Sequence, residues 1–145
     1  MLQKIPFCYI CASLNIRDIL ELYKTDERVE ALAKALNAGK DTRIQLRGLV
    51  GSGDAAVAVA LYFLQHPNMI FVLPDREEAA YFQSDIENLT GKDVLLFPSS
   101  YRKAFEFTQP DSSNVLARAE VLNELNHSSE FGRLIVTYPE ALAEK

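Results

Sequence analysis

Several residue types that carry metal or redox chemistry are scarce in this chain. Tryptophan is absent, and the 145 residues include two histidines and two cysteines. Cys8 and Cys11 form a C-x-x-C pair, but a structural zinc ion needs four ligands, and His66 and His127 lie far from the pair in sequence. We therefore predict no metal site and no disulfide framework, and we expect a cytoplasmic protein.

Two further absences narrow the class of protein. No apolar run approaches the length of about 20 residues that a transmembrane helix requires, so no membrane association is expected. The formal net charge is −5, and the basic residues are scattered, so strong nucleic-acid binding by this chain alone is not expected. Hydrophobic residues make up 48% of the chain, which is enough for the packed core of one domain.

The sequence divides into three segments. Residues 1–14 are expected to be a disordered leader, because their apolar run has no clear helical or strand period. Residues 15–41 are expected to be a helical N-terminal segment, with helices at 16–23 and 26–38. These two short helices precede the α/β unit, and we expect them to pack on its surface.

From residue 42 onward the sequence alternates short apolar runs with helical patterns. This alternation, with long crossovers, predicts an α/β fold whose parallel sheet has helices on both faces. The predicted strands are Arg43–Leu46, Met69–Leu73, Val94–Phe97 and Leu134–Thr137. The predicted helices are Ala55–Gln65, Arg76–Leu89 and, approximately, Ser113–Asn126.

A glycine-rich stretch between the first predicted strand and helix is the strongest candidate site. Gly48, four residues and Gly53 match the phosphate-loop spacing G-x-x-x-x-G-K-[ST]. Asp54 replaces the lysine, and Ala55 replaces the residue whose hydroxyl would hold magnesium. At about 4 Å and an effective dielectric constant of about 20, each unit-charge interaction is worth roughly 4 kcal/mol. The pattern therefore indicates a degenerate phosphate loop, with Asp54 capping the helix in place of a phosphate. Its residues are Gly48, Gly51, Ser52, Gly53, Asp54 and Ala55.

A second informative stretch follows the second predicted strand. Pro74, Asp75, Arg76 and Glu77 stand where helicases carry a segment that contacts DNA phosphates. Asp75, with Glu78 three residues later, also fits a helix capping box. Both interpretations are compatible, because a helix N-terminus can hold a phosphate.

A dinucleotide-binding domain is the alternative interpretation. Gly51, Ser52 and Gly53 begin a match to G-x-G-x-x-[GA], and Asp75 follows about twenty residues later, as the ribose-binding acid of that fold would. Against it, residues 48–50 separate the first strand from these glycines, and Asp75 follows Pro74 in a capping position.

Taken in order, these pieces resemble the N-terminal domain of the bacterial transcription-repair coupling factors (Mfd) and, more distantly, the first domain of UvrB. The resemblance covers residues 42–145, which include the two stretches above. It rests further on Val94–Tyr101 after the third predicted strand, on Arg118–Leu125 and on Leu134–Thr137. It implies a P-loop helicase-like (RecA-like) fold whose nucleotide site has degenerated.

The resemblance also implies a function and partners for a longer parent protein. That protein would be an ATP-dependent DNA translocase that displaces stalled RNA polymerase and recruits UvrA-based nucleotide excision repair. Residues 42–145 would form an incomplete, non-catalytic scaffold or regulatory domain without a cofactor, followed after residue 145 by a UvrA-docking module. ATP and magnesium would bind a downstream motor, and RNA polymerase and double-stranded DNA would bind other domains. The damage-probing hairpin of UvrB is not expected, because residues 101–111 are too few for it.

Overall fold

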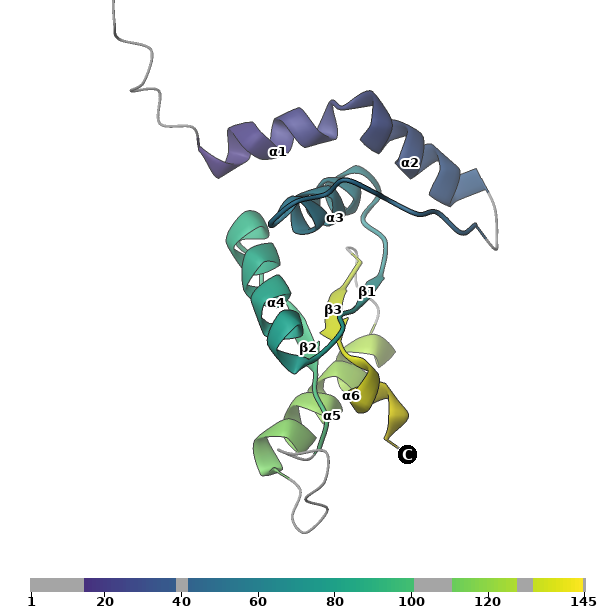
Figure 1. Ribbon diagram of the computed structural model, residues 1–145. Coiled ribbons are helices and arrows are strands. Elements are labelled where there is room, and N and C mark those ends of the chain that lie inside the picture. Colours follow the sequence, from purple (N-terminus) through teal and green to yellow (C-terminus); the bar gives the residue numbers. More distant parts are fainter. Residues whose placement is uncertain (1–14, 39–41, 101–110, 128–131, 145) are drawn as a thin grey trace, which may run out of the picture.

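The computed structural model describes residues 15–38, 42–100, 111–127 and 132–144 (Figure 1). The predicted leader 1–14, with Cys8 and Cys11, and the segment 101–110 lie outside the described residues. In chain order, the elements are α1 (Ile16–Lys24), α2 (Glu27–Ala38), α3 (Gly53–Gln65), β1 (Met69–Val72), α4 (Arg76–Thr90), β2 (Leu95–Phe97), α5 (Ser112–Asn126), β3 (Leu134–Thr137) and α6 (Pro139–Ala143).

The described strands form a three-stranded parallel sheet in the order β1-β3-β2. The central strand β3 is buried along its whole length, which explains its uninterrupted apolar sequence. Ile135 of β3 is in register with Ile70 of β1 and Leu95 of β2. The parallel sheet is therefore confirmed, as are three of the four predicted strands.

Helices cover both faces of this sheet. Phe71, Val136 and Leu96 are in register across the three strands and share one face. On that face the ring of Phe71 contacts Phe82 of α4, with ring centroids 5.0 Å apart. Phe97 faces the opposite side, where α5 packs on β2. The small α/β domain has the layered arrangement that the alternating sequence pattern predicts.

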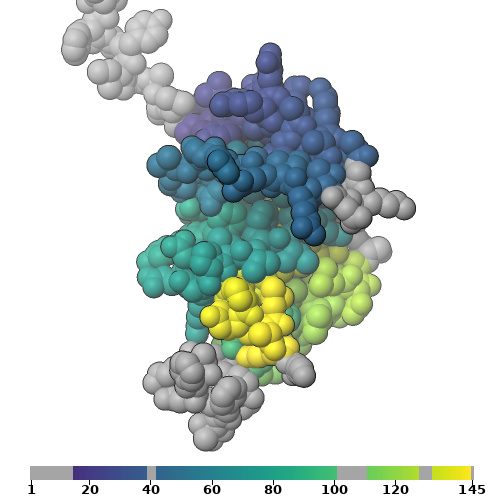
Figure 2. Space-filling model, turned by 45° about the vertical axis from the view of Figure 1, so that its right-hand side comes forward, coloured from purple at the N-terminus to yellow at the C-terminus, as the bar shows by residue number. Residues whose placement is uncertain are grey.

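Helix α3 is the most deeply buried element. All its residues from Ala55 to Tyr62 are buried, because α4 packs on one side and the N-terminal helices pack on the other. Leu20 of α1 and Val29 of α2 contribute buried side chains to this packing. Figure 2 shows α1 and α2 stacked over α3 at one end of the molecule, with α6 toward the other. The expectation that the two N-terminal helices pack on the α/β unit is confirmed.

The prediction of a first strand at Arg43–Leu46 is wrong. Residues 42–50 have no regular secondary structure, and all are exposed. The alternation of apolar Ile44 and Leu46 with polar neighbours suits a strand, but a strand also needs a hydrogen-bonding neighbour. No described strand pairs with this segment, so local preference alone does not make it part of the sheet.

As a result, β1 is an edge strand, and no described strand pairs with the side of β1 that faces away from β3. The N–H groups of Met69 and Leu73 donate to Arg133 and Thr137 at 2.8 and 2.9 Å, so these residues direct their main chain toward β3. The intervening residues Ile70 and Val72 direct theirs to the other edge.

The buried packing of α4 gives a test of this core. Ile86 of α4 is 0% exposed, and Ile86→Ala should lower the free energy of unfolding by about 2–5 kcal/mol, since it leaves a cavity. The matched helical control is Leu122→Ala on the exposed face of α5, which should change stability by less than about 0.5 kcal/mol. Urea unfolding curves of both variants provide the measurement, and equal losses would contradict the layer assignment.

Candidate functional site

The glycine-rich loop leads directly into α3. Gly48 and Gly51 have φ angles of 80° and 57°, in the left-handed region that glycine adopts without strain. The N–H of Gly53 donates to the carbonyl of Val50 at 3.2 Å, which closes a turn just before the helix begins. Ser52 is the N-cap residue, but its side chain makes no capping hydrogen bond. The loop therefore has the turn geometry that the glycine spacing predicts, without the strand expected before it.

Asp54 places a carboxylate on the first turn of α3. Its Oδ1 accepts a hydrogen bond from the N–H of Ala55 at 2.8 Å. The N-cap residue of α3 is Ser52, so the prediction that Asp54 is the cap is wrong. The Asp54 carboxylate nevertheless accepts a hydrogen bond from an N–H group of the first helical turn, as expected. Ala55 is completely buried, so the position of the missing magnesium-binding hydroxyl faces the core. The loop thus carries an anion where a phosphate loop carries a cation.

The second stretch begins α4 in the same way. Asp75 is the N-cap of α4, and its Oδ1 accepts from the N–H of Glu78 at 2.9 Å. This bond is half of the predicted capping box. Pro74, Asp75, Arg76 and Glu77 are all exposed. Arg76 presents a positive charge beside the carboxylates of Asp75 and Glu77, and Glu77 accepts from the hydroxyl of Tyr81 at 3.3 Å.

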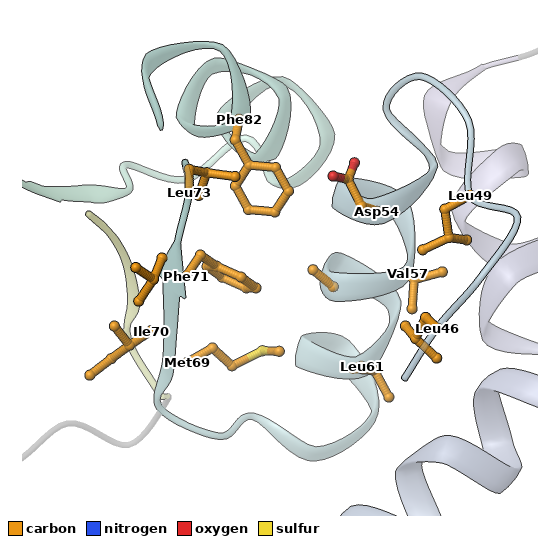
Figure 3. A pocket seen from close by; sticks show the side chains of 12 residues that line it. Leu46, Leu49, Asp54, Val57, Leu61, Met69, Ile70, Phe71, Leu73 and Phe82 are labelled. Atoms are coloured by element: carbon orange, nitrogen blue, oxygen red, sulfur yellow. The ribbon is translucent and has the colours of Figure 1, made fainter. Parts of the chain in front are cut away.

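The structure places Asp54 of the first stretch and Leu73, the residue before the second stretch, along one groove at the carboxyl end of β1. Asp54 and Leu73 line one groove, with Phe82 of α4 between them (Figure 3). Its volume is about 360 Å³, and its other lining residues are apolar. Open α/β sheets bind ligands at this end of their strands. Here each of the two helix N-termini already holds its own carboxylate, which disfavours an incoming phosphate.

Among the described ranges, no three or more His, Cys, Asp or Glu side chains lie together in a way that could hold an ion. Within the same ranges, no helix is long and apolar enough to cross a membrane.

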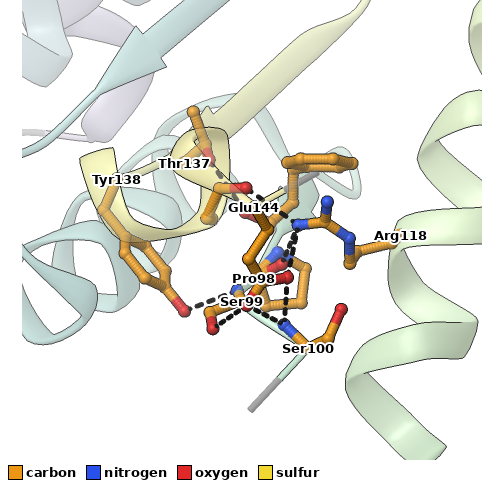
Figure 4. Close-up of polar contacts among 9 residues, drawn as sticks. Pro98, Ser99, Ser100, Arg118, Thr137, Tyr138 and Glu144 are labelled. Carbon is orange, nitrogen blue, oxygen red and sulfur yellow. Dashed lines mark hydrogen bonds and ion pairs between the residues drawn. The ribbon is translucent and has the colours of Figure 1, made fainter. Parts of the chain in front are cut away.

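A polar network at the carboxyl ends of β2 and β3 was not anticipated from the sequence (Figure 4). Its centre is Glu144, just after α6, whose carboxylate accepts from the hydroxyl of Ser99. The N–H of Ser100 donates to both oxygens of the same carboxylate, at 3.0 and 2.9 Å. These bonds connect the chain after β2 to the end of α6.

Arg118 connects α5 to the same network. Its Nη1 donates to the carbonyls of Pro98 and Ala141, each at 2.9 Å, and lies 3.4 Å from Oε2 of Glu144. Its guanidinium lies 4.1 Å from the centroid of the Phe97 ring. One side chain of α5 therefore connects the residue after β2 to α6.

Two hydroxyls complete the network from β3. The hydroxyl of Tyr138 accepts from the N–H of Ser99 at 2.8 Å, and that of Thr137 donates to the carbonyl of Phe97, also at 2.8 Å. All of these bonds join groups within the protein, so we interpret the network as structural. We call it the clamp, and its side chains are those of Ser99, Arg118, Thr137, Tyr138 and Glu144. Its members are separated by tens of residues, and no spacing pattern in the sequence could have revealed it.

The clamp lowers the pKa of Glu144 below its usual value of 4.5. Burial acts in the opposite direction and is the largest single influence. The hydrogen bonds from Ser99 and Ser100, together with the charge of Arg118, outweigh it. Glu144 is therefore ionised at neutral pH, and its ionised form is the one that the fold stabilises.

Comparison of the chain with protein-family models, with curated proteins and with solved structures finds no match.

The pKa of Glu144 predicts how stability depends on pH. Because this pKa is lower in the folded state, its contribution is complete above the ordinary value of 4.5 and is lost as the pH falls through the folded-state value. Glu144→Gln should cost about 1–3 kcal/mol at neutral pH and should flatten the loss of stability on acidification.

Urea unfolding between about pH 6 and about pH 3 measures this difference. Glu140→Gln, on an exposed position of α6, is the matched control and should retain the pH dependence of the parent chain. A Glu144→Gln variant whose stability follows the parent's pH curve would contradict the clamp.

Proposed function

We propose that this chain is a non-catalytic scaffold, a degenerate helicase-like domain of the kind found at the N-terminus of transcription-repair coupling factors. The observation that carries the proposal is the Asp54 carboxylate on the first turn of α3, at the position of the phosphate-binding lysine. The positive φ angles of Gly48 and Gly51 and the helix that follows are compatible with the phosphate-loop pattern, whereas Asp54 carries a charge opposite to that of the lysine in the pattern.

The rest of the site supports the same proposal. A working nucleotide hydrolase needs a group that orients the attacking water and ligands for magnesium. Asp75 is occupied as the cap of α4, and Glu144 is held in the clamp with Arg118. In this proposal the domain supports other modules of a longer protein, in which a separate motor binds ATP and magnesium. Contacts with UvrA, RNA polymerase and double-stranded DNA would come mainly through those modules.

The dinucleotide-binding alternative receives less support. That fold places its glycine turn directly after a strand and uses a free acidic side chain to bind the ribose. Residues 43–46 form no strand here, and Asp75 accepts a hydrogen bond from the backbone of Glu78. Gly51 and Gly53 therefore have neither the preceding strand nor the free acidic side chain that a dinucleotide-binding domain requires.

Nucleotide binding provides a direct test of the non-catalytic role. Calorimetry with ATP–magnesium, ADP and NADH should show no binding at millimolar concentration, because Asp54 repels phosphate. In Asp54→Lys, the exposed side chain reverses its charge, and weak phosphate affinity without hydrolysis is expected. A dissociation constant below about 100 μM for the parent chain, which corresponds to more than about 5 kcal/mol of binding free energy, would overturn the proposal.

Binding to UvrA tests the link to repair. A longer piece of the parent protein that includes the module expected after Lys145 should retain UvrA in a pull-down, whereas residues 1–145 alone should not. Stoichiometric UvrA binding by residues 1–145 would contradict a purely supporting role. Failure of the longer piece to bind UvrA would contradict the relation to transcription-coupled repair.

A further inference from the structure

A small polar cavity lies at the amino ends of β2 and β3, at the opposite end of the strands from Asp54 and the glycine-rich loop. In Figure 1 this is the end of β3 that lies toward α3 and away from α6. The volume of the cavity is about 200 Å³, whereas pockets for drug-sized ligands measure about 300–1,000 Å³. The cavity, which we call the amino-end cavity, therefore suits a ligand smaller than a nucleotide.

Arg133 gives the amino-end cavity a strong hydrogen-bond donor. Its side chain is 13% exposed, and its Nε donates to Oε2 of Glu124 at 3.3 Å. The two terminal amino groups of the guanidinium make no hydrogen bond to a residue that the structure describes. Arginine has the planar donor geometry that matches the two oxygens of a carboxylate.

Lys92 contributes a second positive charge to the cavity. Its Nζ donates to the hydroxyl of Tyr62 at 3.3 Å and lies 5.1 Å from the centroid of that ring. Tyr62 belongs to the buried part of α3, so its ring is fixed in the core of the domain. This contact holds the ammonium group of Lys92 at the wall of the cavity.

The charged groups of the cavity balance one another in sign. Glu124 already offsets Arg133, and the remaining charged lining residues are Lys92 and Asp93. The carboxylate of Asp93 forms no ion pair or hydrogen bond with any residue in the described ranges. A phosphate dianion would meet two carboxylates here as well as two cations. A ligand with one carboxylate and one ammonium group would instead find a complementary charge for each.

The main chain around the cavity is held in place without a ligand. The N–H of Arg133 donates to Oδ1 of Asn68 at 2.8 Å. The N–H of Gly132 donates to the carbonyl of His66 at 3.0 Å. A side chain at Gly132 would collide with the carbonyl of Pro67, so this close approach requires glycine. A frame that is already ordered lowers the entropic cost of binding.

We propose that the amino-end cavity binds a free aliphatic α-amino acid. The carboxylate of the ligand would accept hydrogen bonds from Arg133 and Lys92, and its ammonium group would lie beside Asp93. Leu95 and Leu134, the first residues of β2 and β3, line the same cavity and offer an apolar surface to the aliphatic side chain. This small-molecule site is separate from the scaffold role and goes beyond it.

The experiment titrates the whole isotope-labelled chain with L-leucine, isocaproate and isopentylamine. These probes share one aliphatic group and carry both charges, the carboxylate alone and the ammonium group alone. In amide NMR spectra the signals of Asp93, Gly132 and Arg133 should shift saturably with leucine at millimolar concentration. Isocaproate and isopentylamine should each bind at least about tenfold more weakly, because each lacks one charged group.

Two variants separate the two charged ends of the ligand. Asp93→Asn should weaken leucine binding about tenfold and should not weaken isocaproate binding. Lys92→Gln should weaken the binding of both ligands several-fold, because both place a carboxylate beside this residue. The matched controls are Lys34→Gln on α2 and Glu140→Gln on α6, which are exposed, lie outside the cavity and should bind leucine like the parent chain. The same spectra confirm that each variant remains folded.

Several outcomes would overturn the proposal. These are no saturable shift with leucine at about 10 mM, equal affinity for leucine and its two analogues, and unchanged leucine affinity in both cavity variants. Inorganic phosphate that shifts the same signals and binds more tightly than leucine would identify a general anion site instead. Because the cavity lies away from Asp54, none of these outcomes depends on nucleotide or UvrA binding. A failure of this site is therefore distinguishable from a failure of the scaffold role.

Discussion

The burial of α3 is the interaction on which the rest of the structure depends. This helix carries apolar residues around its whole circumference from Ala55 to Tyr62, so no single neighbour could shield it from water. The α4 layer covers one side, and α1 and α2 cover the other. Because the burial of apolar surface dominates folding, the N-terminal helices are part of the core of this domain. The position of α3 also fixes the glycine-rich loop and one side of the apolar groove between α3 and β1.

Carboxylates lie at the starts of two neighbouring helices of the domain. A helix N-terminus attracts anions, and proteins use it either to bind phosphate or to hold an acidic side chain. Asp54 and Asp75 take the second option at two neighbouring helix starts. In the proposed scaffold role, these two carboxylates are the reason that nucleotides are not expected to bind at this end of the sheet.

The clamp around Glu144 and the open edge of β1 give the sheet two contrasting sides. At β2, Arg118 and Glu144 join the strand ends to α5 and α6 through hydrogen bonds that are satisfied within the protein. At β1, the main chain of Ile70 and Val72 faces outward, and no described element covers those side chains.

The sequence by itself determined the elements whose signals are local. Apolar runs located β1, β2 and β3, and the Asp75 cap marked where α4 begins, because these signals involve residues only a few positions apart. The tertiary structure decided the rest. Arg43–Leu46 has a strand-like pattern but no pairing partner, and the clamp joins Ser99 to Glu144 across 45 residues. Strand pairing and the Ser99–Glu144 hydrogen bond both depend on residues that are distant in sequence and close in space, and a local sequence pattern does not specify such contacts.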